Sequence, residues 1–446
     1  MRIELAIPIS EDELILSTSA ICKKRQGRLF KYLSTDTREL KPGDLFIGLP
    51  GERFSDTDFI TEAKNIGALT VSSSEDSDYT VKKPRAVLLD LAEYYRKKLT
   101  KLYKTIAITG SFGKTTTKSF LSTILGVKYK VFSTRGNNNN DIGLPLTILS
   151  APYDCEVLVL ECGTNAMGEI SALAKCARPD IAIITSIGTS HIQNFGTREN
   201  IAKEKLDILS FGSPRLICPD DEPLLSNCTG IKVGDRWAIE HSFTPRERDN
   251  MLWLDTSCGT APLPFKNKAL TTPLMLSLAA AKAMGMSDNE ISSGVANLGP
   301  RDLRYHFIKL PRYSLIDDAY NASIETIIGA VDNLLSESAK YHSALIGDIL
   351  ELGEHTELIH RELGRELAKK RLSRLFLYGN CKNYILGGIK DYGHYIGEII
   401  LLSGTVDDIA KRLDNILFTG ELLLIKGSHK TGLYLLPEKL KALNCK

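Results

Sequence analysis

The sequence predicts an α/β protein of three domains with a parallel sheet at its centre. The chain has 446 residues, 43% of them hydrophobic and 25% charged, which suits roughly two to four globular domains. From residue 101 to residue 300, short β-rich runs alternate with helical patterns, as in parallel sheets covered by helices. A strand, a glycine turn and a helix follow one another within residues 105–125, so a phosphate-binding loop (P-loop) is expected at the edge of the central sheet.

Residues 1–100 are expected to form the first domain, a small α/β unit. Its expected elements are a strand over 45–49, a helix over 59–68, strands over 69–73 and 86–90, and a helix over 91–99. The polar stretch Asp36, Thr37 and Arg38 precedes them. A loop that pairs an acid with an arginine beside a strand can bind a ligand, but a solvated turn with a surface ion pair explains it equally well.

The stretch that begins at Gly110 is expected to bind a nucleotide. Backbone N–H groups of the glycine turn and of the first helical turn converge there on one point, which favours an anion. Lys114 can reach the β- and γ-phosphates, and the Thr115 hydroxyl can ligate Mg²⁺. Ile108 stands where the usual motif has its first glycine, so the loop is shorter than in common GTPases and ATPases. The expected nucleotide-binding residues of this loop are Gly110, Ser111, Gly113, Lys114, Thr115 and Thr116.

Two other strands of the central domain are expected to lead into polar side chains. Ligands of parallel sheets bind at the carboxyl ends of the strands, where the phosphate loop lies. The strand at 156–161 ends in Glu161, which suits Mg²⁺ because this ion takes carboxylate oxygens beside phosphates. His191 follows the strand at 181–187 and can be a ligand or an ordinary loop residue. A fourth strand is expected over 216–219.

The rest of the central domain gives weaker signals. Residues 136–145 include a run of asparagines and offer many amide donors and acceptors, with a plain loop as the alternative. Lys205 lies in a mixed-charge helical stretch, which by itself indicates a solvated face. No chemistry can be assigned to residues 210–265, and residues 272–284 return to an alanine-rich helical pattern.

Residues 301–446 are expected to form a third, Rossmann-like domain. Its expected strands lie at 313–318, 343–347, 375–378, 399–402 and 422–426. No G-x-G-x-x-G stretch follows a strand, so a dinucleotide cofactor is not supported. His355 and His360 lack the H-E-x-x-H spacing of a zinc site, and we expect both on a helix surface.

The composition narrows the classes of partner and compartment. A net charge of +2 gives no general reason to expect nucleic acid or a membrane as partner. The 9 cysteines include no C-x-x-C pair, which indicates neither a zinc site nor a disulfide framework and fits a reducing compartment. No apolar run approaches the roughly 18 residues of a membrane span, and the N-terminus lacks the apolar core of a signal peptide. We therefore expect a cytoplasmic protein.

Taken together and in this order, the motifs resemble those of the Mur ligase family over nearly the whole chain. Residues 109–117 look like the family's short phosphate loop, residues 136–145 match its G-N-x-N-N-x-I-G-x-P, and residues 161–170 are similar to its E-x-G-x-N-x-x-G-E-I. The segments that continue the series are 186–196, 202–205, 316–322, 347–353 and 426–428.

The resemblance implies amide ligation in the synthesis of a peptidoglycan precursor. ATP phosphorylates a substrate carboxylate, and an amine attacks the acyl phosphate, while Lys114 and metal ions neutralise charge on the transferred phosphoryl group. The pattern is most similar to the member of the family whose substrates are a UDP-N-acetylmuramoyl tripeptide and D-alanyl-D-alanine. ATP and Mg²⁺ are the implied cofactors, and a monomer is expected.

The resemblance also assigns roles to single residues. It implies that Lys205 is the position that the family carbamylates, which turns an ammonium into an anion able to hold a metal ion beside His191. The expected metal ligands are Thr115, Glu161, His191 and Lys205, and the expected catalytic residues are Lys114, His191 and Lys205. Expected contacts with the nucleotide are Asp317 at the ribose, Asn321 at the adenine and Arg304 at the phosphates. The expected substrate-binding residues are Asp36, Thr37, Arg38, Asn137, Asn139, Asn140 and Asn165.

The chain departs from the family pattern in the domain that would hold the UDP-sugar. Ser55, Asp56 and Thr57 stand where this type of member shows D-G-H, and His429 replaces the arginine of K-G-S-R. A related ligase acting on another carboxylate is therefore the main alternative. Folylpolyglutamate and cyanophycin synthetases share the central domain but fit the first hundred residues less well. A non-enzymatic nucleotide-binding regulator would keep the phosphate loop, but the retention of the expected metal-binding positions argues against it.

Overall fold

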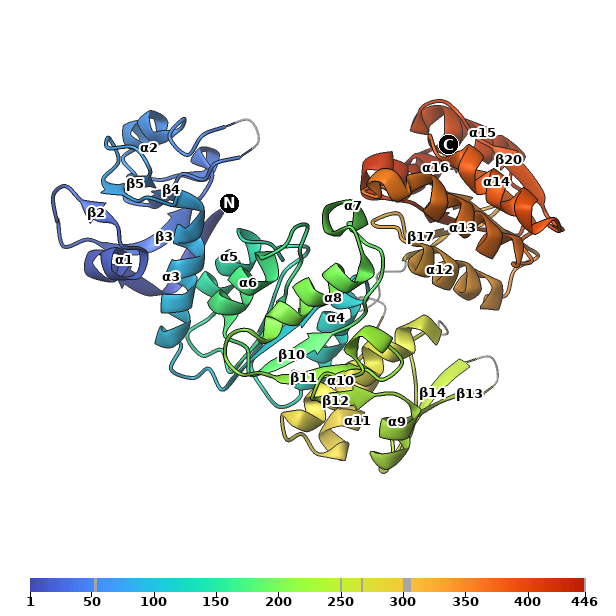
Figure 1. Cartoon of the computed structure of the whole chain (residues 1–446), viewed down its shortest axis with the longest axis horizontal. Coiled ribbons are helices and arrows are strands. Elements are labelled where there is room, and N and C mark those ends of the chain that lie inside the picture. The colour runs from blue at the N-terminus through green and yellow to red at the C-terminus, as the bar shows by residue number, and fades with distance from the viewer. Residues whose placement is uncertain (52–53, 249–250, 266–267, 300–305, 445–446) are drawn as a thin grey trace.

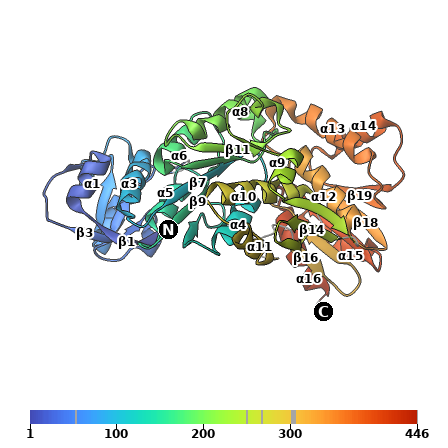
Figure 2. The same ribbon diagram turned by 90° about the horizontal axis from the view of Figure 1, so that it is seen from below.

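The computed structural model of the chain describes residues 1–51, 54–248, 251–265, 268–299 and 306–444. Within these ranges the strands form three six-stranded sheets and one three-stranded sheet. The three larger sheets define the N-terminal, middle and C-terminal parts of the molecule, which run from blue through green to red (Figure 1). The same order is seen from below (Figure 2). The predicted α/β class is confirmed.

The N-terminal part has a mixed sheet with helices beside it. Its strands are β1 (Arg2–Ser10), β2 (Ile21–Cys22), β3 (Leu29–Ser34), β4 (Leu45–Ile47), β5 (Leu69–Ser72) and β6 (Tyr79–Thr80). Its helices are α1 (Glu11–Thr18), α2 (Ile60–Ile66) and α3 (Pro84–Lys98), with a short 3-10 helix, η1 (Thr37–Glu39). The strand order is β1, β3, β4, β5, β6, β2. The expected strands at β4 and β5 and the helix between them are confirmed.

The strand expected over residues 86–90 is wrong, because α3 runs unbroken through it. Val87, Leu91 and Tyr95 are buried at intervals of four residues, which is the spacing of one helix face. Pro84 at the first turn also favours a helix, since a proline there gives up an N–H that has no partner inside the helix. An apolar run this short does not distinguish a strand from a buried helix.

The middle part is built on a parallel sheet, as expected. Its strands are β7 (Lys104–Thr109), β8 (Val131–Ser133), β9 (Val157–Glu161), β10 (Ile181–Ile184), β11 (Arg215–Pro219) and β12 (Ile231–Val233). Its helices are α4 (Lys114–Leu125), α5 (Gly143–Leu149), α6 (Glu169–Ala177), α7 (Ile192–Phe195), α8 (Arg198–Leu206), α9 (Asp235–Glu240), α10 (Thr271–Ala283) and α11 (Asp288–Ala296). The strand order is β12, β11, β10, β7, β9, β8, and every neighbouring pair is parallel.

Helices cover both faces of this sheet. Ile106 and Ile108 of β7 belong to a hydrophobic cluster with α4 and α10, whereas Ala107 between them belongs to the cluster on the opposite face. Helix α4 packs against α10 and α11, and α3 of the N-terminal part packs against α5 and α6. Strand β7 therefore runs through the core, and its carboxyl end delivers the phosphate loop to the edge of the sheet.

A small antiparallel sheet lies where the sequence showed no pattern. It consists of β13 (Thr244–Arg248), β14 (Met251–Thr256) and β15 (Gly259–Pro262). Leu252 and Leu254 of β14 are buried in the cluster that also holds Trp237 and Phe243. Two buried residues of one short strand give too little periodicity for a strand to be predicted from the sequence.

The C-terminal part is a second predominantly parallel sheet. Its strands are β16 (His306–Lys309), β17 (Ser314–Asp317), β18 (Tyr341–Ile346), β19 (Arg374–Leu377), β20 (Glu398–Leu401) and β21 (Glu421–Lys426). Its helices are α12 (Ile324–Ser336), α13 (Thr356–Ala368), α14 (Lys382–Tyr392), α15 (Val406–Ile416) and α16 (Leu436–Asn444). The order is β16, β17, β21, β18, β19, β20, in which β16 runs antiparallel to β17. The five expected strands are confirmed.

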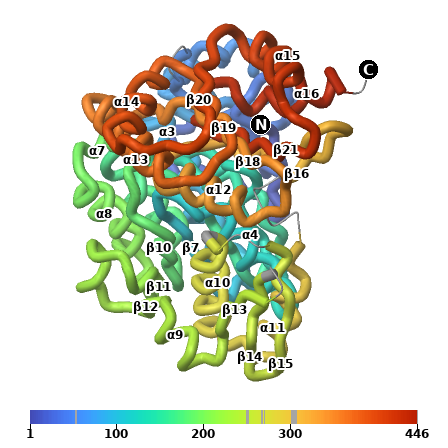
Figure 3. The backbone as a smooth tube through the Cα atoms, turned by 90° about the vertical axis from the view of Figure 1, so that its right-hand side faces the viewer, coloured from blue at the N-terminus to red at the C-terminus, as the bar shows by residue number. Residues whose placement is uncertain are grey.

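The C-terminal part meets the middle part above α10 and α11 in the view of Figure 3. Helix α7 of the middle part contacts the short 3-10 helix η6 (Gly353–His355) of the C-terminal part. The segment that follows the carboxyl end of β10 thus lies beside a loop of the C-terminal part. No helix within the described residues is long and apolar enough to cross a membrane.

Candidate active site

The phosphate loop has the backbone conformation that its glycines require. Gly110 has φ +147°, and a Cβ atom there would collide with the Thr185 side chain. Gly113 has φ +83° and directly precedes the first residue of α4. The segment after β10 supports the loop, because Ser186 Oγ accepts the N–H of Phe112 at 2.9 Å. These contacts fix the loop at the N-terminal end of α4, a position where the helix dipole favours an anion.

Lys114 is the first residue of α4 and folds back over this loop. Its Nζ donates hydrogen bonds to the carbonyl oxygens of Gly110 at 2.6 Å and of Ser111 at 3.4 Å. Ser111 Oγ accepts the N–H of Gly188 at 2.8 Å, and Thr116 is buried one residue beyond Thr115. The predicted nucleotide-binding residues of the loop are thus contiguous around one helix end.

Glu161 at the end of β9 meets Thr115 directly. Its side chain is 1% exposed, Oε2 accepts the Thr115 hydroxyl at 2.8 Å, and Oε1 accepts Asn139 Nδ2 at 2.9 Å. Burial raises the pKa of Glu161, but the charges of Lys118 and Lys114 and these hydrogen bonds together hold it below its ordinary value. A hydroxyl and an ionised carboxylate therefore converge, which is the oxygen donor set that Mg²⁺ takes.

Lys118 is a site residue that the sequence reasoning missed. Its Nζ lies 3.2 Å from Glu161 Oε2 and donates to the carbonyl oxygen of Gly136 at 3.1 Å, so it joins the asparagine loop to the carboxylate. The available signal was its position four residues after Lys114, on the same face of α4. Thr134, also missed, accepts the backbone N–H of Glu161 through Oγ1 at 2.9 Å.

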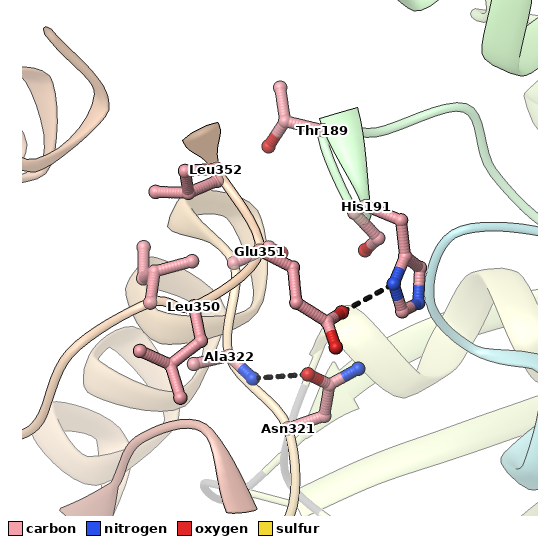
Figure 4. A pocket seen from close by; sticks show the side chains of 10 residues that line it. Thr189, His191, Asn321, Ala322, Leu350, Glu351 and Leu352 are labelled. Atoms are coloured by element: carbon pink, nitrogen blue, oxygen red, sulfur yellow. Dashed lines mark hydrogen bonds and ion pairs between the residues drawn. The ribbon is translucent and has the colours of Figure 1, made fainter. Parts of the chain in front are cut away.

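His191 lies between the sheets of the middle and C-terminal parts. It has φ +58°, directly precedes α7, and its Nδ1 pairs with the carboxylate of Glu351 from the C-terminal part (Figure 4). Burial lowers the pKa of His191, Glu351 opposes that shift, and the charges of Lys114 and Lys205 lower the pKa further. The ring is therefore uncharged more readily than a free histidine, as a metal ligand has to be.

Lys205 is buried in α8, where the sequence alone indicated a solvated face. The residue is 4% exposed, and burial together with the charge of Lys114 lowers its pKa to about 7. The charge of Lys114 also lowers the pKa values of Glu161 and His191. Lys114 thus stands among three titratable groups that arrive from three different strand or helix ends.

The residues expected at the ribose and at the adenine lie at the end of β17 and in the segment that follows this strand. Asp317 is the last residue of β17 and is half-buried. Asn321 follows it, with Oδ1 accepting the N–H of Ala322 at 2.8 Å (Figure 4). Asn321 shares a small pocket with His191 and Glu351. Arg304 lies outside the described residues.

The expected substrate-binding residues are spread over two parts of the molecule. Arg38 of η1 is 85% exposed, and its Nη2 pairs with Asp36 at 2.5 Å, which lowers the pKa of Asp36. Thr37 lies beside them and is buried. Asn139 alone of the expected asparagines bonds to Glu161, whereas Asn137, Asn140 and Asn165 are exposed.

Asp348, His360 and Cys381 of the C-terminal part cluster closely enough to suggest a metal site, with their ligand atoms within 4.8 Å of one another. Both nitrogens of His360 are engaged, however, because Nε2 accepts the N–H of Ile349 at 3.1 Å and Nδ1 bonds to the carbonyl oxygen of Thr356 at 2.7 Å. Burial raises the pKa of the Cys381 thiol to about 11. Asp348 accepts the backbone N–H groups of Asn380 at 2.8 Å and Cys381 at 3.0 Å, so the cluster joins two loops. The expectation of His360 on a helix surface is wrong, because this residue is fully buried.

Comparison with known proteins gives a consistent result. Residues 108–243 match the family described as Mur ligase middle domain. A UDP-N-acetylmuramoyl-tripeptide–D-alanyl-D-alanine ligase of Bacillus subtilis (strain 168) is 33% identical over 420 residues, covering 89% of this chain and 90% of that protein.

Solved structures extend the likeness to the fold of the whole chain. The crystal structure of MurF from Acinetobacter baumannii has a TM-score of 0.87 at 27% identity and covers 98% of this chain and 99% of that chain. MurF ligase from Thermotoga maritima in complex with ADP has a TM-score of 0.79 at 26% identity, covering 92% of this chain and 97% of that chain. With motifs, sequence and fold in agreement over almost its full length, the chain belongs to the Mur ligase family.

Proposed function

We propose that the chain is an ATP-dependent, ADP-forming ligase that joins D-alanyl-D-alanine to a UDP-N-acetylmuramoyl tripeptide. The observation that carries the ligase chemistry is the phosphate loop at the edge of a parallel sheet, where the Thr115 hydroxyl donates to the buried Glu161 carboxylate at 2.8 Å beside Lys114. The motifs of the chain and the activity named for the relatives support these substrates.

The phosphates of ATP would bind at the N-terminal end of α4. Lys114 Nζ, which bonds to carbonyl oxygens of its own loop, would turn to the β- and γ-phosphates. Thr115 and Glu161 would hold Mg²⁺, which offsets negative charge on the phosphates when bound. The Thermotoga maritima relative was solved in complex with ADP, which supports the binding of an adenine nucleotide by this chain.

The proposed reaction proceeds in two displacements. A carboxylate oxygen of the tripeptide attacks the γ-phosphorus, and the bond from that phosphorus to the bridging oxygen breaks, which releases ADP. The dipeptide amine then attacks the acyl carbon, inorganic phosphate leaves with the carboxylate oxygen, and the amine loses a proton. Lys114 would stabilise charge on the transferred phosphoryl group in the first step.

Lys205 is proposed to be carbamylated. Carbamate formation joins a neutral amine to CO₂ and releases a proton, and a lysine whose pKa is lowered to about 7 has a large neutral fraction at physiological pH. The product is a buried anion in place of a buried amine, near the charge of Lys114. We propose that this anion and His191 hold a second metal ion.

The three parts of the molecule would divide the substrates between them. Residues 1–100 would bind the UDP-sugar through Asp36, Thr37 and Arg38, residues 101–300 would bind ATP, and residues 301–446 would close over the nucleotide with Arg304, Asp317 and Asn321. The asparagines at 137, 139, 140 and 165 would contact the peptide substrate. We further propose that the protein acts as a monomer in the cytoplasm.

The second candidate function is a ligase of the same chemistry that acts on another carboxylate. It is favoured by Ser55 and Thr57, whose hydroxyls lie 2.7 Å apart in a turn that bonds to Asp58, in place of the family's D-G-H. Asp56 accepts the backbone N–H of Ser73 at 2.6 Å, so it is turned toward its own sheet. A non-catalytic nucleotide-binding regulator is the weaker alternative.

An omission assay tests the proposed function. Phosphate release is measured with ATP, UDP-muramoyl tripeptide and D-alanyl-D-alanine together, and with each left out in turn. The proposal expects release only in the complete mixture. Equal release without the dipeptide would contradict D-alanyl-D-alanine as the acceptor and leave only the general assignment as a ligase. Background release in every mixture, together with turnover on another carboxylate and amine, would favour the second candidate.

A further inference from the structure

A carboxylate from the C-terminal part reaches the imidazole of His191 in the middle part. Figure 4 shows Glu351 pointing at His191 Nδ1, with the other ring nitrogen on the far side of the ring from the carboxylate. Both residues adopt left-handed backbone conformations, with φ +58° for His191 and +63° for Glu351. Residues with a Cβ rarely adopt this conformation, so surrounding contacts must hold the two backbones in place.

Several contacts hold the two segments against each other. The backbone N–H of Gln193 donates to the carbonyl oxygen of Glu351 at 3.3 Å. Helix α7, which begins one residue after His191, packs on η6, which begins two residues after Glu351, and a Cβ atom at Gly353 would collide with the Gln193 side chain. The Glu351 carboxylate is thus delivered to His191 by docked backbone segments, and not by a flexible surface side chain alone.

The pairing determines which nitrogen of the ring is available. An ionised carboxylate can only accept, so Nδ1 of a neutral His191 carries the proton and Nε2 keeps its lone pair. Metal-binding histidines are commonly fixed in this way, with one nitrogen on the metal and the other donating to a carboxylate that orients the ring.

We propose that Glu351 is a positioning residue that fixes the tautomer and orientation of His191 for metal binding through Nε2. This inference rests on the proposed function, in which His191 holds the second metal ion. It adds that the metal site of the middle part is complete only while the C-terminal part is docked, because a loop of that part supplies the orienting carboxylate.

The test measures Mn²⁺ binding to the full chain in the presence of ADP, by electron paramagnetic resonance of the free ion. Glu351→Ala should weaken one class of Mn²⁺ site by about 10- to 100-fold, the usual effect of removing such a partner. Glu351→Gln should weaken it less, because an amide oxygen still accepts the Nδ1 proton. Glu354→Ala is the matched control on the same loop, with a side chain that is 90% exposed, and should bind Mn²⁺ as the unaltered protein does.

Comparison with His191→Ala distinguishes a failure of the positioning role of Glu351 from a failure of the proposed metal site. If His191→Ala loses one class of site and Glu351→Ala keeps both at unaltered affinity, Glu351 has no positioning role and the proposed function stands. If His191→Ala keeps both classes, the metal assignment itself fails. A second readout is the dependence of turnover on Mg²⁺. Glu351→Ala should recover most of its kcat at high Mg²⁺ if the residue acts through metal affinity, whereas a loss of kcat that Mg²⁺ does not restore would overturn the proposal.

Discussion

Replacing Lys118 with methionine is expected to destabilise the middle part by about 3 kcal/mol at neutral pH. Lys118 Nζ and Glu161 Oε2 lie 3.2 Å apart, and the two side chains are 8% and 1% exposed. Removing one partner of such a buried pair costs about 3–5 kcal/mol, because the other charge stays buried without its counter-ion. We expect the lower end, since Thr115 and Asn139 still donate to the carboxylate.

The loss of stability in Lys118→Met is expected to depend on pH, because Glu161 is a titratable group. The folded pKa of Glu161 is lowered, so this group stabilises the fold above its unfolded pKa, and the contribution is lost as pH falls through the folded pKa. Lys118→Met removes one of the groups that lower the pKa of Glu161, so this pKa should be higher in the variant than in the unaltered protein. Acidification therefore costs the variant less stability than it costs the unaltered protein. The difference between the two proteins should therefore be largest at neutral pH and shrink toward about pH 4.

Urea unfolding followed by tryptophan fluorescence measures this difference. Trp237 is buried in the hydrophobic cluster that covers α4, so its emission reports on the middle part. Lys128→Met is the matched control, because Lys128 on the surface pairs with Glu290 at 3.2 Å, and such pairs contribute about 0–1 kcal/mol. A free energy of unfolding for Lys118→Met equal to that of the control, or a difference that does not shrink in acid, would refute the reasoning.

Three further predictions concern activity. Lys114→Ala should keep the fold and lower ATP turnover by roughly 10²-fold or more, measured as phosphate release, because a charge that stabilises the transferred phosphoryl group is gone. Unchanged turnover would contradict the assignment of the loop to a nucleotide. Lys205→Ala should lose most activity and regain part of it with acetate or formate. Lys203→Ala, on the exposed side of the same helix, should keep its activity. Full activity in Lys205→Ala would contradict the proposed carbamate. Arg38→Ala should raise the apparent KM for the UDP-peptide far more than that for ATP, and an equal rise in both would contradict a substrate role remote from the phosphate loop.

Local sequence signals predicted the centre of the molecule well. The glycines at 110 and 113 and the helix after Lys114 are properties of one short stretch, and the structure shows them as predicted. Glu161 could be anticipated because it ends an apolar run, and parallel strands that end at one edge bring such residues together.

Other features depend on contacts that a linear pattern does not contain. The charge of Lys205 suggested solvent, yet α8 buries it, and only the resemblance to a family indicated otherwise. The pairing of His191 with Glu351 joins connecting segments of the middle and C-terminal parts, so no spacing predicts it. The run at 86–90 had too few residues to separate helix from strand, and packing of α3 on α5 and α6 decided the outcome.

The most direct test of the proposed chemistry follows an oxygen atom. The terminal carboxylate of the UDP-muramoyl tripeptide is labelled with ¹⁸O, and the phosphate released in the complete reaction is analysed by mass spectrometry. Ligation through an acyl phosphate predicts that one ¹⁸O atom from the carboxylate appears in each released phosphate and that the peptide product retains the other. Unlabelled phosphate accompanied by peptide product would contradict an acyl-phosphate ligase.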